Sequence, residues 1–379
     1  MGVKLLLKGC HFNIIIYIIL QKCRDFNFLC KKIYVIKQSL LTALIAVSGF
    51  AAFAQKEHHK VIAIGFYNVE NFFDTEDNPA KQDEDFTPKG PYGYTTEVYT
   101  AKKHNIATAL SKLGTDVTPD GPAIIGIAEV ENEGVLKDLA KEPELKSRNY
   151  QVVCFPTPDE RGISTAMMYN PKYFRVLSAS PHHVPLESIG KKRPTRDVLY
   201  VCGILAGDTV HILVNHWPSK SGGEAASAPA RRIAAQTAKN LIDSLQKANP
   251  NNKILLMGDL NDNPTSDGVI NVLQARAFRK DLTATDIYNP WINMYKNGLG
   301  TESFRGEWNL IDQIMISGAF VNNTNNKWQY LRQEIFNREF LKNSLGRDRG
   351  LPHRSFTVNR VWDNGYSDHF PVVMYFIEK

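Results

Sequence analysis

Acidic, amide and histidine side chains gather in six short motifs of this 379-residue chain, and each motif adjoins a run of apolar residues. Carboxylate and amide oxygens are the ligands that hard cations such as Mg²⁺ prefer, and histidine exchanges protons near neutral pH. One such motif alone is usually a turn or a solvated strand end, but six in one chain indicate a shared site. In chain order they are NVENFFD (68–74), IAEVEN (127–132), VNHWPSK (214–220), GDLNDNP (258–264), LIDQIMIS (310–317) and SDHFPV (367–372).

The elements that must position these motifs are mostly strands. Short runs rich in β-branched and aromatic residues predict strands over 61–66, 123–128, 151–155, 165–169, 198–205, 210–215, 253–258, 313–317 and 372–377. Apolar residues at helical spacing predict helices over 101–113 and 230–248, with shorter ones over 135–139 and 269–273. The polar segments 74–100, 180–196, 281–301 and 322–360 are expected to be irregular insertions at a functional rim. Because several strands follow one another directly, we expect layered sheets flanked by helices, with the site where strand ends meet.

In their order and approximate spacing, the six motifs resemble those of the endonuclease/exonuclease/phosphatase superfamily. That group includes DNase I, the apurinic endonucleases, neutral sphingomyelinases and inositol polyphosphate 5-phosphatases. The resemblance covers about residues 61–377, and GDLNDNP together with SDHFPV is its most specific part. It implies an α/β fold, a DNase I-like four-layer α/β/β/α sandwich of two mixed sheets flanked by helices, with the site at one end of the sheets.

The resemblance also implies a metal site. Glu129 is expected to bind Mg²⁺, for which Mn²⁺ or Ca²⁺ could substitute, with Asn68, Glu70 and Asp368 close to the ion. A metal held there would polarise a phosphoryl oxygen and offset charge on the leaving oxygen.

The remaining motif residues are expected to carry the acid–base chemistry. Asp259 would orient and deprotonate the attacking water, and Asn261 would position the water or the phosphate. His369 and Asp312 are similar to the family's histidine–aspartate couple, in which the carboxylate favours an imidazolium that stabilises developing charge or gives a proton. His216 matches a second phosphate-contacting position.

Two basic features are less specific. Arg231 and Arg232 follow His216 by about fifteen residues and could grip a substrate phosphate, or they could be an exposed charge pair at the start of a helix. The segment 328–362 mixes basic and aromatic residues, which suits single-stranded nucleic acid but equally suits a surface loop packed by aromatic rings.

Residues 1–54 predict a leader with a secretory signal peptide. The leader holds seven of the 45 basic residues and one of the 39 acidic residues, so 38 of each sign remain from Gln55 onward. Lysines at 31–37 precede an apolar run at 39–54 that ends in an A-x-A site, which predicts cleavage after Ala54. We therefore expect a periplasmic or secreted protein without a membrane anchor, whose single catalytic domain covers 55–379. A second apolar run at 12–20 favours a start codon assigned too early.

Composition narrows the class of protein. Hydrophobic residues make up 43% of the chain and charged residues 22%, which is typical of a globular protein and excludes a collagen, a disordered tail and a polytopic membrane protein. Five cysteines are too few for a disulfide scaffold, and three of them lie in the leader. Cys154 and Cys202 remain, and we expect two buried small side chains, although an oxidising compartment permits a disulfide.

The sequence therefore favours a secreted, divalent-metal-dependent phosphoesterase whose substrate is nucleic acid. The stretch VNHWPSKSGG followed by paired arginines is similar to secreted bacterial nucleases of the superfamily. The alternative is a phosphatase or a phospholipase-C-like hydrolase that acts on a small phosphorylated or lipid headgroup. A degenerate binding protein is disfavoured because all six motifs are intact, and no protein partner is implied.

Overall fold

The computed structural model describes residues 60–321 and 327–378. The leader predicted over residues 1–54, with its cleavage site and three cysteines, lies outside the described residues. No helix in the two described ranges combines the length and the apolar character that crossing a bilayer requires.

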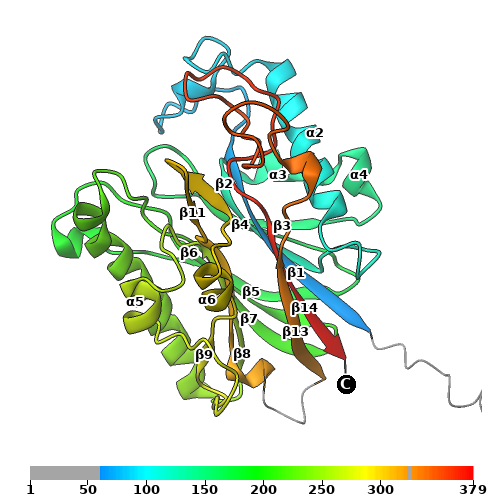
Figure 1. Cartoon of the computed structure of the whole chain (residues 1–379), viewed down its shortest axis with the longest axis vertical. Coiled ribbons are helices and arrows are strands. Elements are labelled where there is room, and N and C mark those ends of the chain that lie inside the picture. Colours follow the sequence, from blue (N-terminus) through cyan, green and yellow to red (C-terminus); the bar gives the residue numbers. More distant parts are fainter. Residues whose placement is uncertain (1–59, 322–326, 379) are drawn as a thin grey trace, which may run out of the picture. The chain divides into compact units, whose positions relative to one another are not determined.

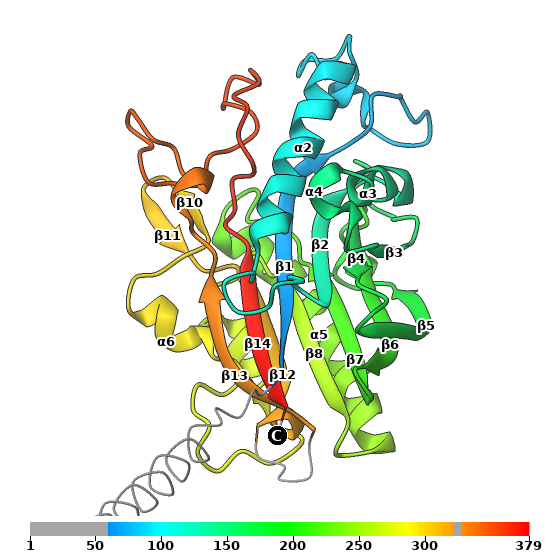
Figure 2. The same cartoon turned by 90° about the vertical axis from the view of Figure 1, so that its right-hand side faces the viewer.

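The first sheet contains six strands in the order β13-β14-β1-β2-β4-β3, which Figure 2 shows face-on. Its strands are β1 (Val61–Phe72), β2 (Ile124–Val130), β3 (Gln151–Cys154), β4 (Ser164–Tyr169), β13 (Trp328–Ile335) and β14 (Val372–Glu378). The sheet is mixed, because β1 and β2 run parallel while the other neighbours are antiparallel. Strand β1 is central and almost wholly buried, so its end can hold side chains rigidly.

The second sheet repeats this plan with the strand order β5-β6-β7-β8-β12-β9. Its strands are β5 (Phe174–His182), β6 (Val198–Leu205), β7 (Asp208–His216), β8 (Lys253–Asp259), β9 (Ile287–Tyr288) and β12 (Asp312–Ser317). Here β7 and β8 are the parallel pair, and the other neighbours are antiparallel.

The two sheets pack face to face, and alternation along β8 shows how. Leu255 and Met257 belong to the core between the sheets, whereas Ile254 and Leu256 pack against the helix on the other face. Gly126 of β2 lies so close to the second sheet that a Cβ there would meet Met257 Sδ at 2.5 Å. Opposed strands therefore approach closely where the site residues begin.

Helices cover the outer faces of both sheets, with α5 on one side and α2, α3 and α4 on the other (Figure 1). The helices are α2 (Thr96–Lys112), α3 (Glu133–Ala140), α4 (Pro143–Lys146), α5 (Glu224–Ala248) and α6 (Trp291–Lys296). A separate two-stranded sheet consists of β10 (Glu302–Phe304) and β11 (Glu307–Asn309). The predicted four-layer α/β/β/α sandwich of two mixed sheets is confirmed.

Several predicted element boundaries were wrong, and most errors concern sheet edges. Segment 322–360, expected to be irregular, contains the edge strand β13, and segment 281–301 contains β9 and α6. Strand β5 was missed because it is an edge strand with many exposed residues, so it lacks a clean apolar alternation. The helix predicted over 269–273 is a single π-helical turn, Gly268–Val272.

Candidate active site

Three of the predicted residues form one row across the end of the second sheet. Asp259 at the end of β8 is paired in register with Asp312 at the start of β12 and with His216 at the end of β7. All three are buried. The register of the sheet thus brings together motifs that are separated by more than forty residues in the sequence.

Both carboxylate oxygens of Asp259 accept hydrogen bonds. The backbone N–H of Asn261 donates to Oδ1 at 2.9 Å, and Asn68 Nδ2 donates to Oδ2 at 3.0 Å. Burial raises the pKa of Asp259 to about 7, although the charge of His369 acts in the opposite direction. A carboxyl group with this pKa can exchange a proton near neutral pH.

His369 forms the predicted couple with Asp312. Its Nδ1 lies 2.8 Å from Asp312 Oδ2, and its Nε2 lies 4.0 Å from Asp259 Oδ2. Burial alone would lower the pKa of His369, but the charge and hydrogen bond of Asp312 outweigh it, so the pKa is raised well above its ordinary value. Ser367 anchors the segment, since its Oγ accepts from the His369 backbone N–H and donates to the Asn68 carbonyl. His369 is therefore an imidazolium held in a fixed orientation.

His216 faces the same carboxylate but is held neutral. Its Nε2 lies 3.5 Å from Asp259 Oδ2 and 3.8 Å from Glu129 Oε1. Burial, together with the charges of Arg196 and Arg161, lowers the pKa of His216 well below its ordinary value. The two histidines therefore differ in charge although they flank one aspartate.

Glu70 and Glu129 occupy strained backbone at the ends of β1 and β2. Their φ angles are 52° and 64°, in the left-handed region that few residues other than glycine adopt. The pairing register shifts at both positions, as in a β-bulge, and such bulges commonly re-aim side chains beside active sites. One oxygen of each carboxylate accepts a backbone N–H, from Ser355 for Glu70 and from Asn71 for Glu129.

The charges around Glu70 fit a divalent cation. Burial and the charge of Asp368 raise the pKa of Glu70 to about 7, while burial lowers the pKa of the enclosed Lys102 to about 8. Asp368 pairs with Arg354 at 3.1 Å. In the described ranges, the carboxylate oxygens of Glu70, Glu129 and Asp368 do not all lie within 4.8 Å of one another. At this spacing an ion such as Mg²⁺ would bind one or two of the carboxylates directly and reach the rest through its water ligands.

The Asn68 side chain connects Glu70 to Asp259. Its Oδ1 accepts the Glu70 backbone N–H at 3.0 Å, and its Nδ2 donates to Asp259. Because both ends of the amide are engaged, this geometry favours an orienting role for Asn68 over direct metal binding. It also links the end of β1 to the end of β8.

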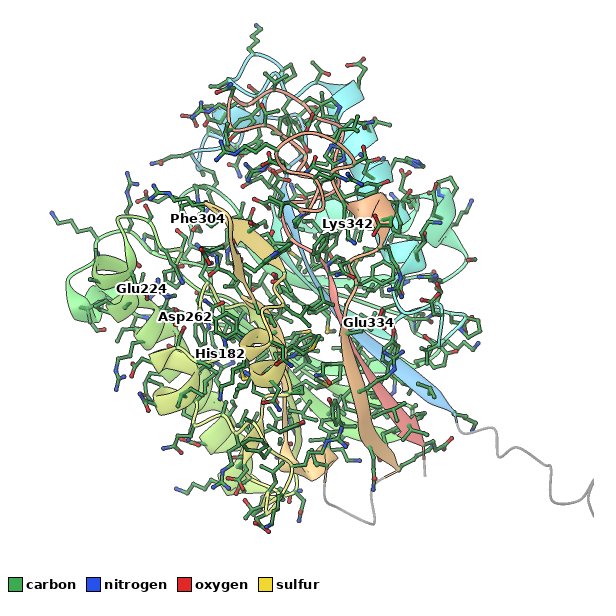
Figure 3. All side chains as sticks on the ribbon, in the orientation of Figure 1. His182, Glu224, Asp262, Phe304, Glu334 and Lys342 are labelled. Atoms are coloured by element: carbon green, nitrogen blue, oxygen red, sulfur yellow. The ribbon has the colours of Figure 1, made fainter. Side chains whose placement is uncertain are left out.

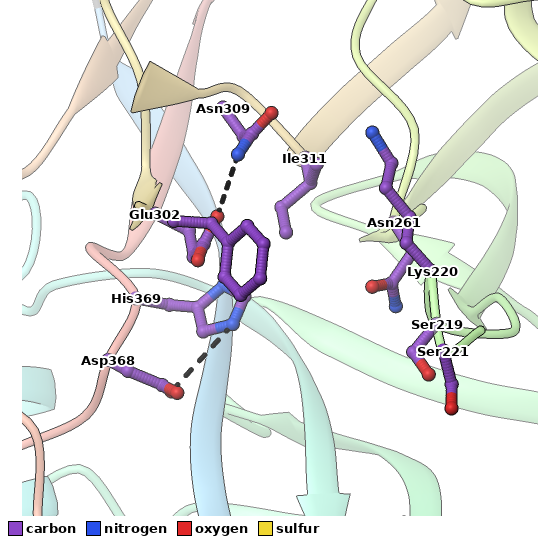
Figure 4. A pocket seen from close by; sticks show the side chains of 10 residues that line it. Ser219, Lys220, Ser221, Asn261, Glu302, Asn309, Ile311, Asp368 and His369 are labelled. Atoms are coloured by element: carbon purple, nitrogen blue, oxygen red, sulfur yellow. Dashed lines mark hydrogen bonds and ion pairs between the residues drawn. The ribbon is translucent and has the colours of Figure 1, made fainter. Parts of the chain in front are cut away.

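A cleft of about 340 Å³ opens beside these groups. Figure 4 shows His369 and Asp368 on one side of it and Asn261, Lys220 and Ser219 on the other. Its rim includes Phe304 of the small β10–β11 sheet (Figure 3), whose side chain is 59% exposed. A ligand in this cleft would contact the imidazolium directly.

Comparison with known families identifies this arrangement. Residues 63–379 match the Endonuclease/Exonuclease/phosphatase family. The chain belongs to this family. Membership of the endonuclease/exonuclease/phosphatase family supports phosphoester hydrolysis as the class of reaction. A search of curated proteins finds no match.

Solved structures agree with the fold of an endonuclease/exonuclease/phosphatase protein. A humanized TDP2 from D. rerio with 14 mutations is 12% identical, with a TM-score of 0.50, and the match covers 83% of this chain and 98% of that one. D. rerio TDP2 complexed with single-strand DNA product is also 12% identical, with a TM-score of 0.50 and coverages of 84% and 99%. The mannosyl-6-phosphatase Bt3783 of Bacteroides thetaiotaomicron VPI-5482 is 13% identical, with a TM-score of 0.49 and coverages of 83% and 99%. At 12% identity, the similarity to the two TDP2 structures establishes the fold alone.

The paired arginines do not line the site of this family member. Arg231 is fully buried in α5, where its guanidinium bonds to Asp262, Ser227 and Glu224. Figure 3 shows Glu224 and Asp262 close together beside α5. Arg232 is half-exposed and pairs with Asp267. This geometry favours structural ion pairs over the predicted contact with substrate phosphate.

Sequence reasoning missed several charged residues around the site. Lys102 of α2 is fully buried and donates to Ser355 Oγ, and Arg196 donates to the Trp217 carbonyl and to Asp159. A lysine in an amphipathic helix gives no signal of burial, because only the tertiary packing encloses it. Arg354 lay in the segment noted as basic, but its pairing with Asp368 was not predicted.

Proposed function

We propose that the protein is a divalent-metal-dependent phosphoesterase that hydrolyses nucleic-acid phosphodiesters. The observation that carries the proposal is the buried unit of Asp259, His369 and Asp312, in which His369 lines an open cleft. This unit couples a carboxyl group that titrates near neutral pH to an oriented imidazolium. The carboxyl group can accept a proton from the attacking water, and the imidazolium can stabilise charge or give a proton, so the pair suits hydrolysis of a phosphoester.

Asp259 would act as the base. Asn68 and the backbone of Asn261 hold its two oxygens in place, so the carboxylate can orient a water and accept its proton. Asn261 Nδ2 donates to the Trp217 carbonyl at 3.0 Å, which fixes the turn rather than the substrate. In place of the predicted contact with water or phosphate, Asn261 would hold the turn that carries Asp259.

His369 would stabilise the negative charge that develops on the phosphoryl group, or donate a proton to the leaving oxygen. Asp312 holds Nδ1, so Nε2 is the atom that meets the substrate. The neutral His216 would donate one hydrogen bond to a phosphoryl oxygen from the other side of Asp259. No covalent enzyme intermediate is needed.

Glu129, Glu70 and Asp368 would hold the divalent cation, for which Mg²⁺ is the first choice. When bound, the ion would polarise the phosphoryl oxygen as a Lewis acid. Lys102 and Arg354 limit the repulsion among the three carboxylates.

Nucleic acid is the preferred substrate because the cleft places an exposed aromatic ring beside polar groups. Phe304 offers a surface on which a base can stack, an interaction worth about 1–3 kcal/mol per base. Lys220 and Ser219 lie across the cleft, where they can bind backbone phosphate. D. rerio TDP2, a protein with the same fold, has been solved with single-strand DNA product.

A phosphatase or phospholipase-C-like activity is the second candidate. The cleft volume of about 340 Å³ falls within the roughly 300–1,000 Å³ that small-molecule sites occupy. A small phosphorylated headgroup would therefore fit, although it would leave the exposed ring of Phe304 without a base to stack on.

We also propose export after cleavage at Ala54, which would place the enzyme in the periplasm or outside the cell. The A-x-A site and the preceding lysines support this. N-terminal sequencing of exported protein should begin at or near Gln55, and an intact leader would contradict export by this route.

A substrate panel with Mg²⁺, Mn²⁺ or Ca²⁺ tests the function. It compares single- and double-stranded DNA, RNA, sphingomyelin, inositol phosphates and bis-p-nitrophenyl phosphate. We expect hydrolysis of nucleic acid that prolonged EDTA dialysis abolishes and added metal restores. Preferential hydrolysis of a small headgroup would favour the second candidate, and full activity after dialysis would exclude metal dependence.

Glu129→Gln tests the metal ligand, because the amide lacks the charge that holds a hard cation. We expect weaker activation by Mg²⁺ and lower kcat, with unfolding temperature preserved. The matched control is Glu133→Gln, which removes an exposed carboxylate four residues further along the chain and should leave both quantities unchanged.

A further inference from the structure

The segment 74–85 between β1 and α2 contains a second group of acids, separate from the catalytic one. One carboxylate oxygen from each of Asp77, Asp83 and Glu84 lies within 4.8 Å of the other two. Asp77 and Glu84 are exposed, whereas Asp83 is only 2% exposed. We refer to these three residues as the acidic-loop cluster.

Asp83 holds one buried carboxylate oxygen that has no hydrogen-bond partner. The backbone N–H of Asn78 donates to its Oδ1 at 3.2 Å, but Oδ2 is enclosed and unpartnered. Burial raises the pKa of Asp83, and the charges of Asp77 and Asp74 raise it further. Because buried polar atoms in native proteins nearly always have a partner, this oxygen points to a ligand that binds between the three acids.

The nearby basic side chains in the described part of the chain are engaged elsewhere. Lys81 lies in the same loop, but its Nζ donates to the carbonyls of Thr157 at 2.6 Å and Asp159 at 3.0 Å. Arg360 approaches the loop but pairs with Asp85, which is not part of the cluster. Among the described residues, no ion pair offsets the charge of these three carboxylates.

We propose that the acidic-loop cluster is a Ca²⁺ site. Ca²⁺ binds oxygen ligands at about 2.3–2.6 Å in flexible geometry, so two ligands of one ion can lie up to about 5 Å apart. The spacing of the cluster fits this range. Mg²⁺ requires near-ideal octahedral geometry at about 2.0–2.1 Å, whereas Ca²⁺ tolerates the irregular geometry of loop carboxylates. Water and backbone carbonyls would complete the coordination.

The bound ion would fix the loop beside the strand that carries Glu70. Phe86, which follows the cluster, stacks on Phe73 with ring centroids 4.3 Å apart, and Phe73 directly follows β1. On the other side, the Gln82 backbone N–H donates to the Glu160 carbonyl at 2.7 Å. Figure 1 shows this loop, in blue and cyan, next to the orange and red segment that precedes β14. Ca²⁺ would therefore order the loop without touching the substrate.

Calorimetric titration with CaCl₂ and thermal unfolding with and without Ca²⁺ test the site. Both are run on purified Glu129→Gln protein, which weakens the catalytic metal site. We expect this parent to bind Ca²⁺ and its Tm to rise with added Ca²⁺, because a ligand that binds the folded state stabilises it. Adding Asp77→Asn and Glu84→Gln should weaken Ca²⁺ binding at least tenfold and remove the Tm rise. Both substituted side chains are exposed, so the fold should survive, whereas Asp83→Asn would change a buried side chain.

Glu76→Gln is the matched control, since it removes one exposed charge from the same loop outside the cluster. It should bind Ca²⁺ like its parent. The proposal is overturned if the parent shows no Ca²⁺-dependent rise in Tm. It is equally overturned if the cluster variant keeps the parent's affinity, or if Glu76→Gln loses as much affinity as the cluster variant does.

Discussion

At the scale of single residues, Asp259 lies between two histidines whose surroundings shift their pKa values in opposite directions. Asp312 bonds to His369 at 2.8 Å and raises its pKa, whereas burial beside Arg196 lowers the pKa of His216. The same side chain can thus serve as a cationic group at one position and as a neutral hydrogen-bond donor at the other. His369 and Asp312 are therefore expected to act as one unit.

Substitutions in this unit should not have additive effects on turnover. General acid–base assistance is worth about 10²–10⁴ in rate, so His369→Ala should lower kcat by that order. Asp312→Ala should lower kcat less, because Asp312 orients the imidazole without touching the phosphate. The double variant should resemble His369→Ala alone. Steady-state kinetics per folded molecule and melting temperature are measured on the same samples. If the melting temperature falls while kcat is unchanged, the two residues form a structural pair.

At the scale of elements, the strands that the sequence predicted best are those buried on both faces. All seven residues of β8 are buried, so its continuous apolar run was recognisable. The bulges that turn Glu70 and Glu129 were not predictable, because a shift in register depends on the partner strand. The requirement for glycine at position 258 was not predictable either, because the neighbouring strand β7 imposes it. A Cβ on Gly258 would lie 2.2 Å from the Asn215 carbonyl oxygen.

Gly258→Ala should therefore destabilise the sheet and displace Asp259. A backbone oxygen cannot move aside without separating β7 from β8, so we expect a loss of about 1–3 kcal/mol in the free energy of unfolding together with lower kcat. Gly65→Ala is the matched control in β1, because the atom nearest to its new Cβ, at 2.8 Å, would be the end of the Leu113 side chain rather than backbone. Denaturant unfolding should show a smaller loss for Gly65→Ala. Equal losses of unfolding free energy in the two variants would show that the close approach of β7 to Gly258 does not cause the destabilisation.

At the scale of the whole catalytic domain, the motifs gave the family and most of the site, while tertiary packing decided the rest. Asp259, His369, Asp312 and His216 meet as the resemblance implied. Three features could not be predicted from the sequence: the burial of Lys102, the burial of Arg231 and the two hydrogen bonds of the Asn68 side chain. Each depends on which partner the fold brings to a polar group, and residues distant in sequence supply that partner.

The same packing bears on whether the sandwich needs a covalent link between its layers. Cys154 lies in β3 of the first sheet and Cys202 in β6 of the second, and both thiols are free and half-buried. The apolar core between the sheets is continuous without them, because residues of both sheets belong to one buried cluster. Packing alone can therefore hold the layers together.

Alkylation of the exported protein should show directly that no disulfide joins the two sheets. Burial raises the pKa of Cys154 to about 12, so almost none of its thiol is ionised at neutral pH and iodoacetamide should react with it slowly in the native state. After unfolding in denaturant without reductant, both thiols should react, and mass spectrometry should find two modifications. If the two modifications appeared only after reductant was added, a disulfide would join the cysteines and the layers would be cross-linked. With two free thiols, Cys154→Ala should cost only the packing of a small side chain and leave phosphoesterase activity unchanged.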